Sequence, residues 1–502
     1  MKLLNYLISK KTTYLTNIAL GVAGFICLSQ GVNEQTKVLA YFSSFFFYFL
    51  VRRLNIWENI IVGLAIGGSL GYTLYSWLSL FADFTALNLS VAFNAVVFAV
   101  VFASAHSLYK KFPDSLFINV FALSTGVFAI RTIFHYSPVF AYVKAFLMVV
   151  NTSTVFDWLV PYFGSTITDV LVLATGSLIA LIYIQVRNKK ISQSLYIYVA
   201  CFILILTVPI IKLLHPSRSL PQTESVKVAL VQGSFNWSWE ERLKQTDHII
   251  KYYIAETKYA ARKGAEIVVW PEYAVPMDIL HDRREISEQL ANLSSKENVV
   301  LVTGSLELIT DQLNPNGKWI GYDLSLVFDP EKILLEPYRA VYPISNNVKV
   351  GNKPIIFDTK YGSFPVISCF EVAYHKFVAD YSNQNHPLDF FIGIANIQLF
   401  QGTEGGKRIK DHIRRIAMEN GKYFIYVSNT GPSFVLNPAG EFEHLIPNLK
   451  KETLIVNIRK IKERTFYSRY QDLPLFMFFV VGYWATYSRL KKKKRKKSKE
   501  RN

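Results

Sequence analysis

The feature that most constrains this chain is a series of long apolar runs, which fill much of residues 1–215 and return at 472–488. A membrane-spanning helix needs about 20 mainly apolar residues, because all its backbone polar groups must be hydrogen-bonded within the segment. Runs of this kind predict eight spans, the second being short, at about 13–29, 37–51, 60–82, 86–108, 115–135, 166–185, 193–213 and 472–488. We therefore expect a polytopic α-helical membrane domain.

Basic residues stand beside these runs in an order that predicts the topology. The clusters are Lys10-Lys11, Arg52-Arg53, Lys110-Lys111, Arg187 with Lys189 and Lys190, and the tail that starts at Lys491. With eight spans and the N-terminus inside, every cluster falls on the cytoplasmic side, as the positive-inside rule requires. We expect a bacterial cytoplasmic (inner) membrane protein with both termini in the cytoplasm, and with residues 214–471 on the periplasmic or outer side.

The net charge of +18 also raises the question of a nucleic-acid partner. Much of this charge lies in the C-terminal tail and in the clusters beside the spans, where it anchors helix ends and attracts anionic lipid. We therefore expect membrane lipids, and no nucleic acid, as partners of the basic segments.

Between the last two spans the composition becomes that of an ordinary globular domain. Apolar strands are predicted at 226–231, 267–270, 299–303, 324–328, 365–369, 390–395, 424–428, 433–436 and 453–457, with helices at 239–262, 286–293 and 404–420. Such a mixture of strands and helices indicates a layered α/β domain. The predicted plan is spans 1–7 in residues 1–214, an exported domain in 220–465, a last span in 470–490 and a basic cytoplasmic tail in 491–502.

Two residues at the ends of predicted strands are candidates for chemistry. Glu272 follows the strand at 267–270 and could be a general base, although an exposed loop glutamate is the simpler interpretation. Cys369 ends the strand at 365–369 and could be a nucleophile, although free cysteines are usually small buried hydrophobes. Because Cys369 has no possible disulfide partner in the exported domain, its presence in an oxidising compartment favours use.

Four short segments, in this order, resemble the nitrilase (carbon–nitrogen hydrolase) superfamily. They are Val231-Gln232-Gly233, the segment from Trp270 to Pro276, Cys369-Phe370-Glu371 and Asn429-Thr430-Gly431. With membrane spans before and after the domain, the chain resembles a divergent member of the membrane-embedded apolipoprotein N-acyltransferases. The resemblance implies an α-β-β-α sandwich with a Glu–Lys–Cys catalytic triad.

The resemblance also implies an activity. Such an acyltransferase moves an acyl chain from a phospholipid donor, through a cysteine thioester, to the lipid-modified N-terminal cysteine of an apolipoprotein acceptor. By this likeness, Glu272 would be the general base, Cys369 the nucleophile and Glu371 a supporting carboxylate. No cofactor and no metal site is expected, since the sequence has no phosphate-binding loop and no histidine cluster.

The chain departs from the family pattern at the catalytic lysine. Tyr338 occupies the corresponding position, so Arg339, or another cation such as Lys349, is the expected replacement. Three functions therefore stay open: N-acyl transfer to lipoproteins, a membrane-anchored amidase or acyltransferase with another acceptor, and an inactive paralogue that binds lipid or lipoprotein.

Overall fold

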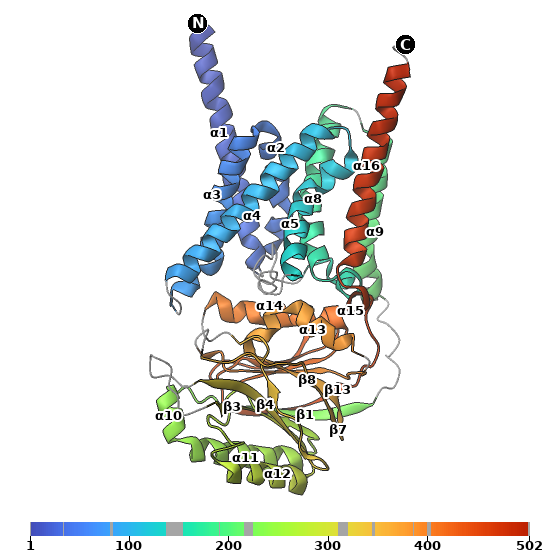
Figure 1. Cartoon of the computed structure of the whole chain (residues 1–502). Helices are drawn as coiled ribbons and strands as arrows, with labels where there is room; N and C mark the ends of the chain where they lie inside the picture. Colours follow the sequence, from blue (N-terminus) through green and yellow to red (C-terminus); the bar gives the residue numbers. More distant parts are fainter. Residues whose placement is uncertain are drawn as a thin grey trace. The chain divides into compact units, whose positions relative to one another are not determined.

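The computed structural model describes residues 2–33, 35–80, 84–136, 154–189, 191–214, 224–309, 320–343, 347–384, 386–398 and 403–499. Lys190 and residues 500–502, which belong to the predicted basic segments, lie outside these ranges. The chain divides into a helical unit, Met1–Ser217 with Tyr470–Asn502, and an α/β unit, Arg218–Arg469 (Figure 1). The predicted combination of a polytopic helical part with an α/β sandwich is confirmed.

Each predicted span contains a helix in the structure. The helices of this unit are α1 (Lys2–Ser29), α2 (Ala40–Arg53), α3 (Ile56–Tyr75), α4 (Phe84–Lys111), α5 (Leu116–His135), α7 (Val160–Phe163), α8 (Thr166–Arg187), α9 (Gln193–Leu214) and α16 (Leu473–Lys499). Among the described residues, four helices are long and apolar enough to cross a membrane, namely α1, α4, α5 and α8. Together they indicate a membrane protein, while the eight-span topology stays a prediction.

One face of helix α3 is built from glycine. Gly63, Gly67 and Gly71 are four residues apart and lie on the face that packs against α4. A Cβ atom on Gly67 would lie 2.3 Å from the carbonyl oxygen of Asn94. The glycines therefore allow the close backbone approach that small residues give to helix pairs in membranes.

Helices α5 and α8 share an ion pair inside the helical unit. The guanidinium of Arg131 on α5 donates to the carboxylate of Asp169 on α8, and both side chains are completely buried. Two charges of opposite sign held together in this way are tolerated where a single buried charge would not be.

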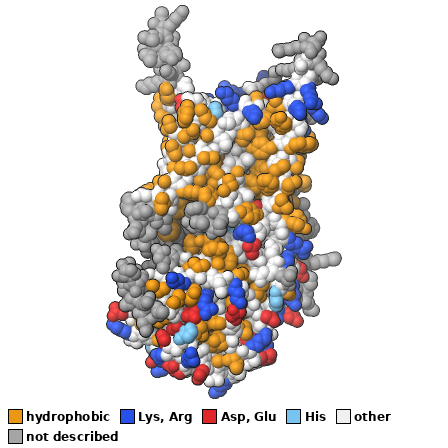
Figure 2. All heavy atoms as spheres, viewed as in Figure 1, with side chains coloured by type: hydrophobic (Ala, Val, Ile, Leu, Met, Phe, Trp, Pro, Cys, Tyr) orange, Lys and Arg blue, Asp and Glu red, His pale blue; other side chains and the backbone are white. Residues whose placement is uncertain are grey.

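The outer surface of the helical unit is largely apolar (Figure 2). Exposed side chains include Ile18 on α1, Ile61 on α3, Leu89 on α4, Leu204 on α9 and Trp484 on α16. Both chain ends lie at the same end of this unit (Figure 1), and Lys and Arg side chains gather there (Figure 2). An apolar belt with basic residues at one end is typical of proteins that cross a bilayer.

The α/β unit contains two sheets that pack face to face. One has the order β13-β1-β2-β3-β4-β5, with β6 also paired to β4, and the other has the order β12-β11-β10-β9-β8-β7. The strands are β1 (Ser225–Gln232), β2 (Ile267–Val269), β3 (Val300–Leu308), β4 (Gly321–Asp329), β5 (Ile333–Leu334), β6 (Tyr338–Arg339), β7 (Ile356–Thr359), β8 (Gly362–Ser368), β9 (Phe391–Ala395), β10 (Phe424–Ser428), β11 (Ser433–Leu436), β12 (Phe442–Ile446) and β13 (Glu452–Arg459).

Helices cover the outer face of each sheet (Figure 1). Their bounds are α10 (Trp239–Lys244), α11 (Thr246–Arg262), α12 (Arg284–Glu297), α13 (His375–Ser382), α14 (Glu404–Asn420) and α15 (Phe466–Tyr470). Ile250 on α11 and Leu290 on α12 pack on the first sheet, and Val378 on α13 and Ile416 on α14 pack on the second. A separate apolar core, which includes Val269, fills the space between the sheets.

The single helix predicted at 239–262 is in fact two helices. Helix α10 ends at Lys244, Gln245 leaves helical geometry, and α11 begins at Thr246. The continuous apolar periodicity concealed this break, which turns α10 and its Arg242 toward the loop that follows β2.

Candidate active site

Glu272 is placed by a tight turn that follows β2. The turn packs on β3, where the N–H of Gly304 donates to the carbonyl of Pro271 at 3.2 Å. A Cβ atom at Gly304 would lie 2.5 Å from the Cα of Glu272, so only glycine leaves room for this approach. The Glu272 side chain is 5% exposed, and a carboxyl group is thereby held inside the protein at the carboxyl end of a strand.

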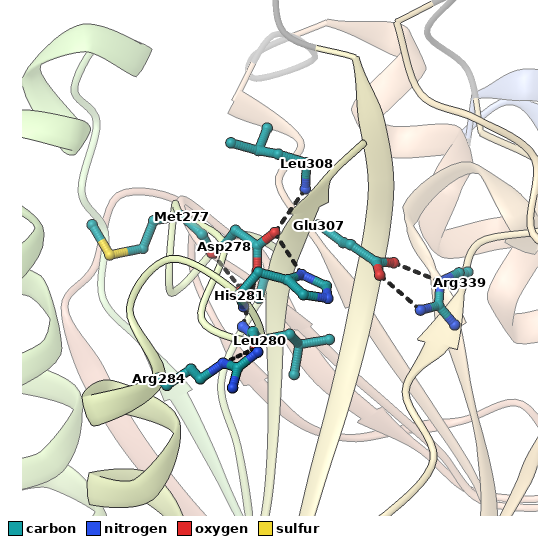
Figure 3. A network of polar contacts seen from close by, with 9 residues as sticks. Met277, Asp278, Leu280, His281, Arg284, Glu307, Leu308 and Arg339 are labelled. Carbon is teal, nitrogen blue, oxygen red and sulfur yellow. Dashed lines mark hydrogen bonds and ion pairs between the residues drawn. The ribbon is translucent and has the colours of Figure 1, made fainter. Parts of the chain in front are cut away.

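Asp278 joins the later part of the loop after β2 to β3 through hydrogen bonds (Figure 3). Its carboxylate accepts hydrogen bonds from the N–H groups of Leu280 at 2.9 Å, His281 at 3.0 Å and Leu308 at 2.9 Å. The segment that carries Glu272 is therefore fixed to the sheet on both sides of the carboxyl group.

Cys369 stands at the junction between β8 and a short 3-10 helix, η5 (Cys369–Ala373). Its φ is +37°, in the left-handed region that residues with a side chain rarely adopt. Such backbone strain occurs mainly at functional sites, where the surrounding structure maintains it. The residue as a whole is only partly buried.

The structure brings Glu272 and Cys369 together from different sheets. The carboxyl group of Glu272 lies beside the thiol of Cys369, close enough for each group to act on the protonation of the other. Its Oε2 also accepts the N–H of Asn396, the residue after β9, at 2.6 Å. A carboxylate in contact with a thiol can take the proton of that thiol as the sulfur attacks a carbonyl carbon.

Burial controls the protonation of this pair. It raises the pKa of Glu272 to about 7, although hydrogen bonds and the charge of Arg242 favour the ionised form. Burial also raises the pKa of the Cys369 thiol well above its usual value, and the nearby carboxyl groups raise it further. The sulfur is therefore protonated at neutral pH and needs a base at the moment of reaction.

Glu371 organises the turn that presents Cys369. Its Oε1 accepts the Tyr338 hydroxyl at 2.6 Å and the N–H groups of Val341 at 2.7 Å and Tyr342 at 3.2 Å. Its Oε2 accepts the N–H of Ser368 at 2.9 Å and so caps the helix that begins at Cys369. The side chain is completely buried, and the carboxylate joins the loop after β6 to the end of β8.

Arg339, predicted to replace the family lysine, is engaged elsewhere (Figure 3). Its guanidinium donates to the carboxylate of Glu307 on β3, at 2.6 Å from Nε and 2.9 Å from one terminal nitrogen. The other suggested cation, Lys349, has an exposed side chain. Tyr338, at the lysine position, is buried and bonds to Glu371. Among the described residues the cation that acts on Glu272 is Arg242.

Two of the motif residues hold the sheets together. Gln232, the last residue of β1, donates to the carbonyl groups of Pro447 at 2.7 Å and Lys450 at 2.8 Å. Asn429, after β10, exchanges hydrogen bonds with the backbone of Phe235 at 3.0 and 3.2 Å. Both side chains therefore join loops at the ends of strands from different sheets.

Two residues of the site were not predicted from the sequence. Asp323 lies on β4, where it accepts the hydroxyl of Ser368 at 2.5 Å and contacts Glu272. Arg242 is almost completely buried and donates to the carbonyl of Tyr273. The one feature of the sequence that could have pointed to Asp323 as a site residue is that it is a charged residue in an otherwise apolar strand. Arg242 cannot be distinguished in the sequence from a surface residue of an amphipathic helix.

Comparison with known proteins agrees with this architecture. Residues 227–464 match the carbon-nitrogen hydrolase family. The chain is 26% identical to an apolipoprotein N-acyltransferase of Aquifex aeolicus over 80% of this chain and 91% of that protein. For the one of Coxiella burnetii the identity is 26% over 61% of this chain and 64% of the relative. A nitrilase-superfamily structure, Saccharomyces cerevisiae Nit3, is 20% identical, with a TM-score of 0.40, and covers 52% of this chain and 98% of its own.

Most of the two-sheet unit with Glu272 beside Cys369 thus matches the carbon-nitrogen hydrolases. It is joined to helices long enough to cross a membrane, as part of a bacterial membrane protein. The chain is a divergent relative of the apolipoprotein N-acyltransferases.

Proposed function

We propose that this protein transfers an acyl chain from a membrane phospholipid to the N-terminal, lipid-modified cysteine of an apolipoprotein. The observation that carries the proposal is the placement of the Glu272 carboxyl group beside the thiol of Cys369, a partly buried residue. A base in contact with a nucleophile of high pKa suits covalent acyl transfer. The relatives named above bear the name of this activity.

In the first step the sulfur of Cys369 attacks the ester carbonyl of the phospholipid while Glu272 takes the thiol proton. The ester C–O bond breaks, the proton passes to the departing glycerol oxygen, and a lysophospholipid leaves. In the second step the α-amino nitrogen of the acceptor attacks the thioester. The C–S bond breaks, a proton returns to the sulfur, and an amide product is released.

The topology that we propose places both termini in the cytoplasm and the α/β unit, with its catalytic site, on the outer side of the inner membrane. Support comes from the Lys and Arg side chains that gather at the end of the helical unit where the two termini lie (Figures 1 and 2). The domain plan that we propose is seven spans in residues 1–214, the catalytic domain in 220–465 and the last span in 470–490.

The test uses the full-length protein with a phospholipid labelled in its acyl chain. We expect a hydroxylamine-sensitive label on the peptide that contains Cys369, and transfer of the label to a peptide with a lipid-modified N-terminal cysteine and a free amino group. Cys369→Ala should lose both signals, by at least about 10³-fold. Cys201→Ala, which removes an exposed thiol of the helical unit, is the matched control and should keep both.

Two results would contradict the proposal. Unchanged transfer by the Cys369→Ala variant would exclude this thiol as the nucleophile. Release of the label only as free fatty acid, with none on the peptide, would indicate a hydrolase and not an acyltransferase.

A further inference from the structure

A second carboxyl group, that of Asp323, lies against the Glu272–Cys369 pair. Asp323 is 4% exposed on β4, and its Oδ2 accepts the Ser368 hydroxyl at 2.5 Å. Its Oδ1 finds no N–H or O–H donor of a non-acidic group within the described part of the chain. The carboxyl group of Glu272 lies beside Asp323, and each carboxyl group acts on the protonation of the other.

Two ionised carboxylates can only accept hydrogen bonds, so a contact between them requires a proton on one. The surroundings decide which one carries it. Glu272 accepts the N–H of Asn396 and lies near the charge of Arg242, both of which favour its ionised form. For Asp323 no cation contributes among the described residues, and burial together with Glu272 raises its pKa well above the usual value. The proton therefore resides on Asp323.

We propose that Asp323 is a positioning residue that keeps a proton in the active form and donates a hydrogen bond to Glu272, so that Glu272 stays ionised and directed at the thiol. This inference rests on the proposed role of Glu272 as the base. This role of Asp323 also explains how Glu272 can stay ionised although Arg339 binds Glu307. The protonated carboxyl group of Asp323 supplies a hydrogen-bond donor beside Glu272.

The arrangement predicts how the reaction rate depends on pH. The titratable and charged groups that act on this site are Glu272 and Tyr273 from the loop after β2, Cys369 from η5, Arg242 from α10 and Tyr426 from β10. Below about pH 7 Glu272 gains a proton and the base is lost. At higher pH Asp323 loses its proton. The hydrogen-bond donor to Glu272 is then lost, and a second negative charge lies beside Glu272 and the sulfur. The rate should therefore fall on both sides of an optimum.

The test measures the pH dependence of two reactions of the full-length protein without Cys27 and Cys201. One is acyl-enzyme formation from labelled phospholipid, and the other is alkylation of Cys369 by iodoacetamide. Asp323→Asn keeps a donor toward Glu272 and an acceptor for Ser368, but it does not titrate. Asp323→Leu removes both. The matched control is Asp329→Asn, at a buried aspartate of the same strand that is hydrogen-bonded to backbone N–H groups away from the thiol.

We expect the Asn variant to keep the optimal rate within about threefold and to lose the alkaline decline. The Leu variant should fall by about 10²-fold or more while its unfolding temperature shows that it folds. The Asp329 control should keep the alkaline decline. An Asn variant as slow as the Leu variant, or one with an unchanged alkaline decline, would overturn the inference. If no protein forms an acyl-enzyme, the proposed function fails, and the alkylation rates near neutral pH still test Asp323: the Asn variant should keep the wild-type rate and the Leu variant should lose it, whereas an Asn variant as slow as the Leu variant would overturn the inference.

Discussion

Replacing Glu371 by glutamine tests how the thiol turn is held. The carboxylate accepts three donors on Oε1 and the N–H of Ser368 on Oε2. Glutamine can offer one oxygen to the three donors, but its amide nitrogen then faces the N–H of Ser368. A buried N–H without an acceptor costs about 1–3 kcal/mol. For an α/β unit of this size the unfolding temperature should fall by roughly 2–4 °C for each kcal/mol.

The size of this effect should depend on pH, with a sign that follows from burial. Burial raises the pKa of Glu371 from its ordinary value of 4.5 to about 7. Between these values the folded protein binds more protons at this group than the unfolded chain, so wild-type stability falls as the pH rises. The difference of about 2.5 pH units corresponds to about 3 kcal/mol. The glutamine variant lacks this loss, because its side chain does not titrate.

The unfolding temperatures of wild type and Glu371→Gln, measured in one detergent from pH 5 to pH 8, should therefore converge. Because the ionised carboxylate accepts all four donors, we expect the variant to unfold several degrees lower at pH 8, and lower by several degrees more at pH 5, where protonation of Glu371 stabilises the wild type. Glu288→Gln, at an exposed site on α12, is the control and should give a constant gap. A gap for Glu371→Gln that does not change with pH would refute the reasoning.

Two further predictions concern the cations near the site. Arg339→Ala should keep acyl transfer within about threefold, because this guanidinium binds Glu307; a loss of about 10²-fold or more would show that it stabilises the oxyanion. Arg242→Gln should move the acid limb of the pH–rate profile to higher pH, because the charge of Arg242 favours ionised Glu272; an acid limb at the wild-type pH would show that this charge does not act on the base.

The sequence predicts much of this fold because the physical causes are local. A run of apolar residues long enough to span lipid, or an apolar strand such as Ile267–Val269, shows its environment in its own composition. The positions of Glu272 and Cys369 at strand ends could be predicted for the same reason, because the apolar strand before each residue is visible in the sequence. The short strands β5 and β6, by contrast, have two residues each and are defined by pairing with β4, which no local pattern reveals.

The charged neighbours of Glu272 cannot be predicted from local sequence patterns. Asp323 becomes a neighbour of Glu272 only when β4 and the loop after β2 come together in space. Arg242 is buried because a helix breaks at Gln245, where the apolar periodicity continues unchanged. Arg339 is next to the expected lysine position in sequence, yet β-pairing with Leu324 leaves its guanidinium at Glu307. Each of these depends on tertiary contacts.

The buried pair of Arg131 and Asp169 has a consequence for how the chain enters the membrane during synthesis. The helix with the arginine leaves the ribosome before the helix with the aspartate, so for a time the cation has no counter-charge from α8. An arginine at the centre of a single helix opposes insertion by roughly 2.5–3.5 kcal/mol, and Arg131, four residues from the end of α5, should oppose it by less. Stable integration of α5 should therefore wait for α8, and chains truncated between the two helices should release α5 from the bilayer more readily than longer ones.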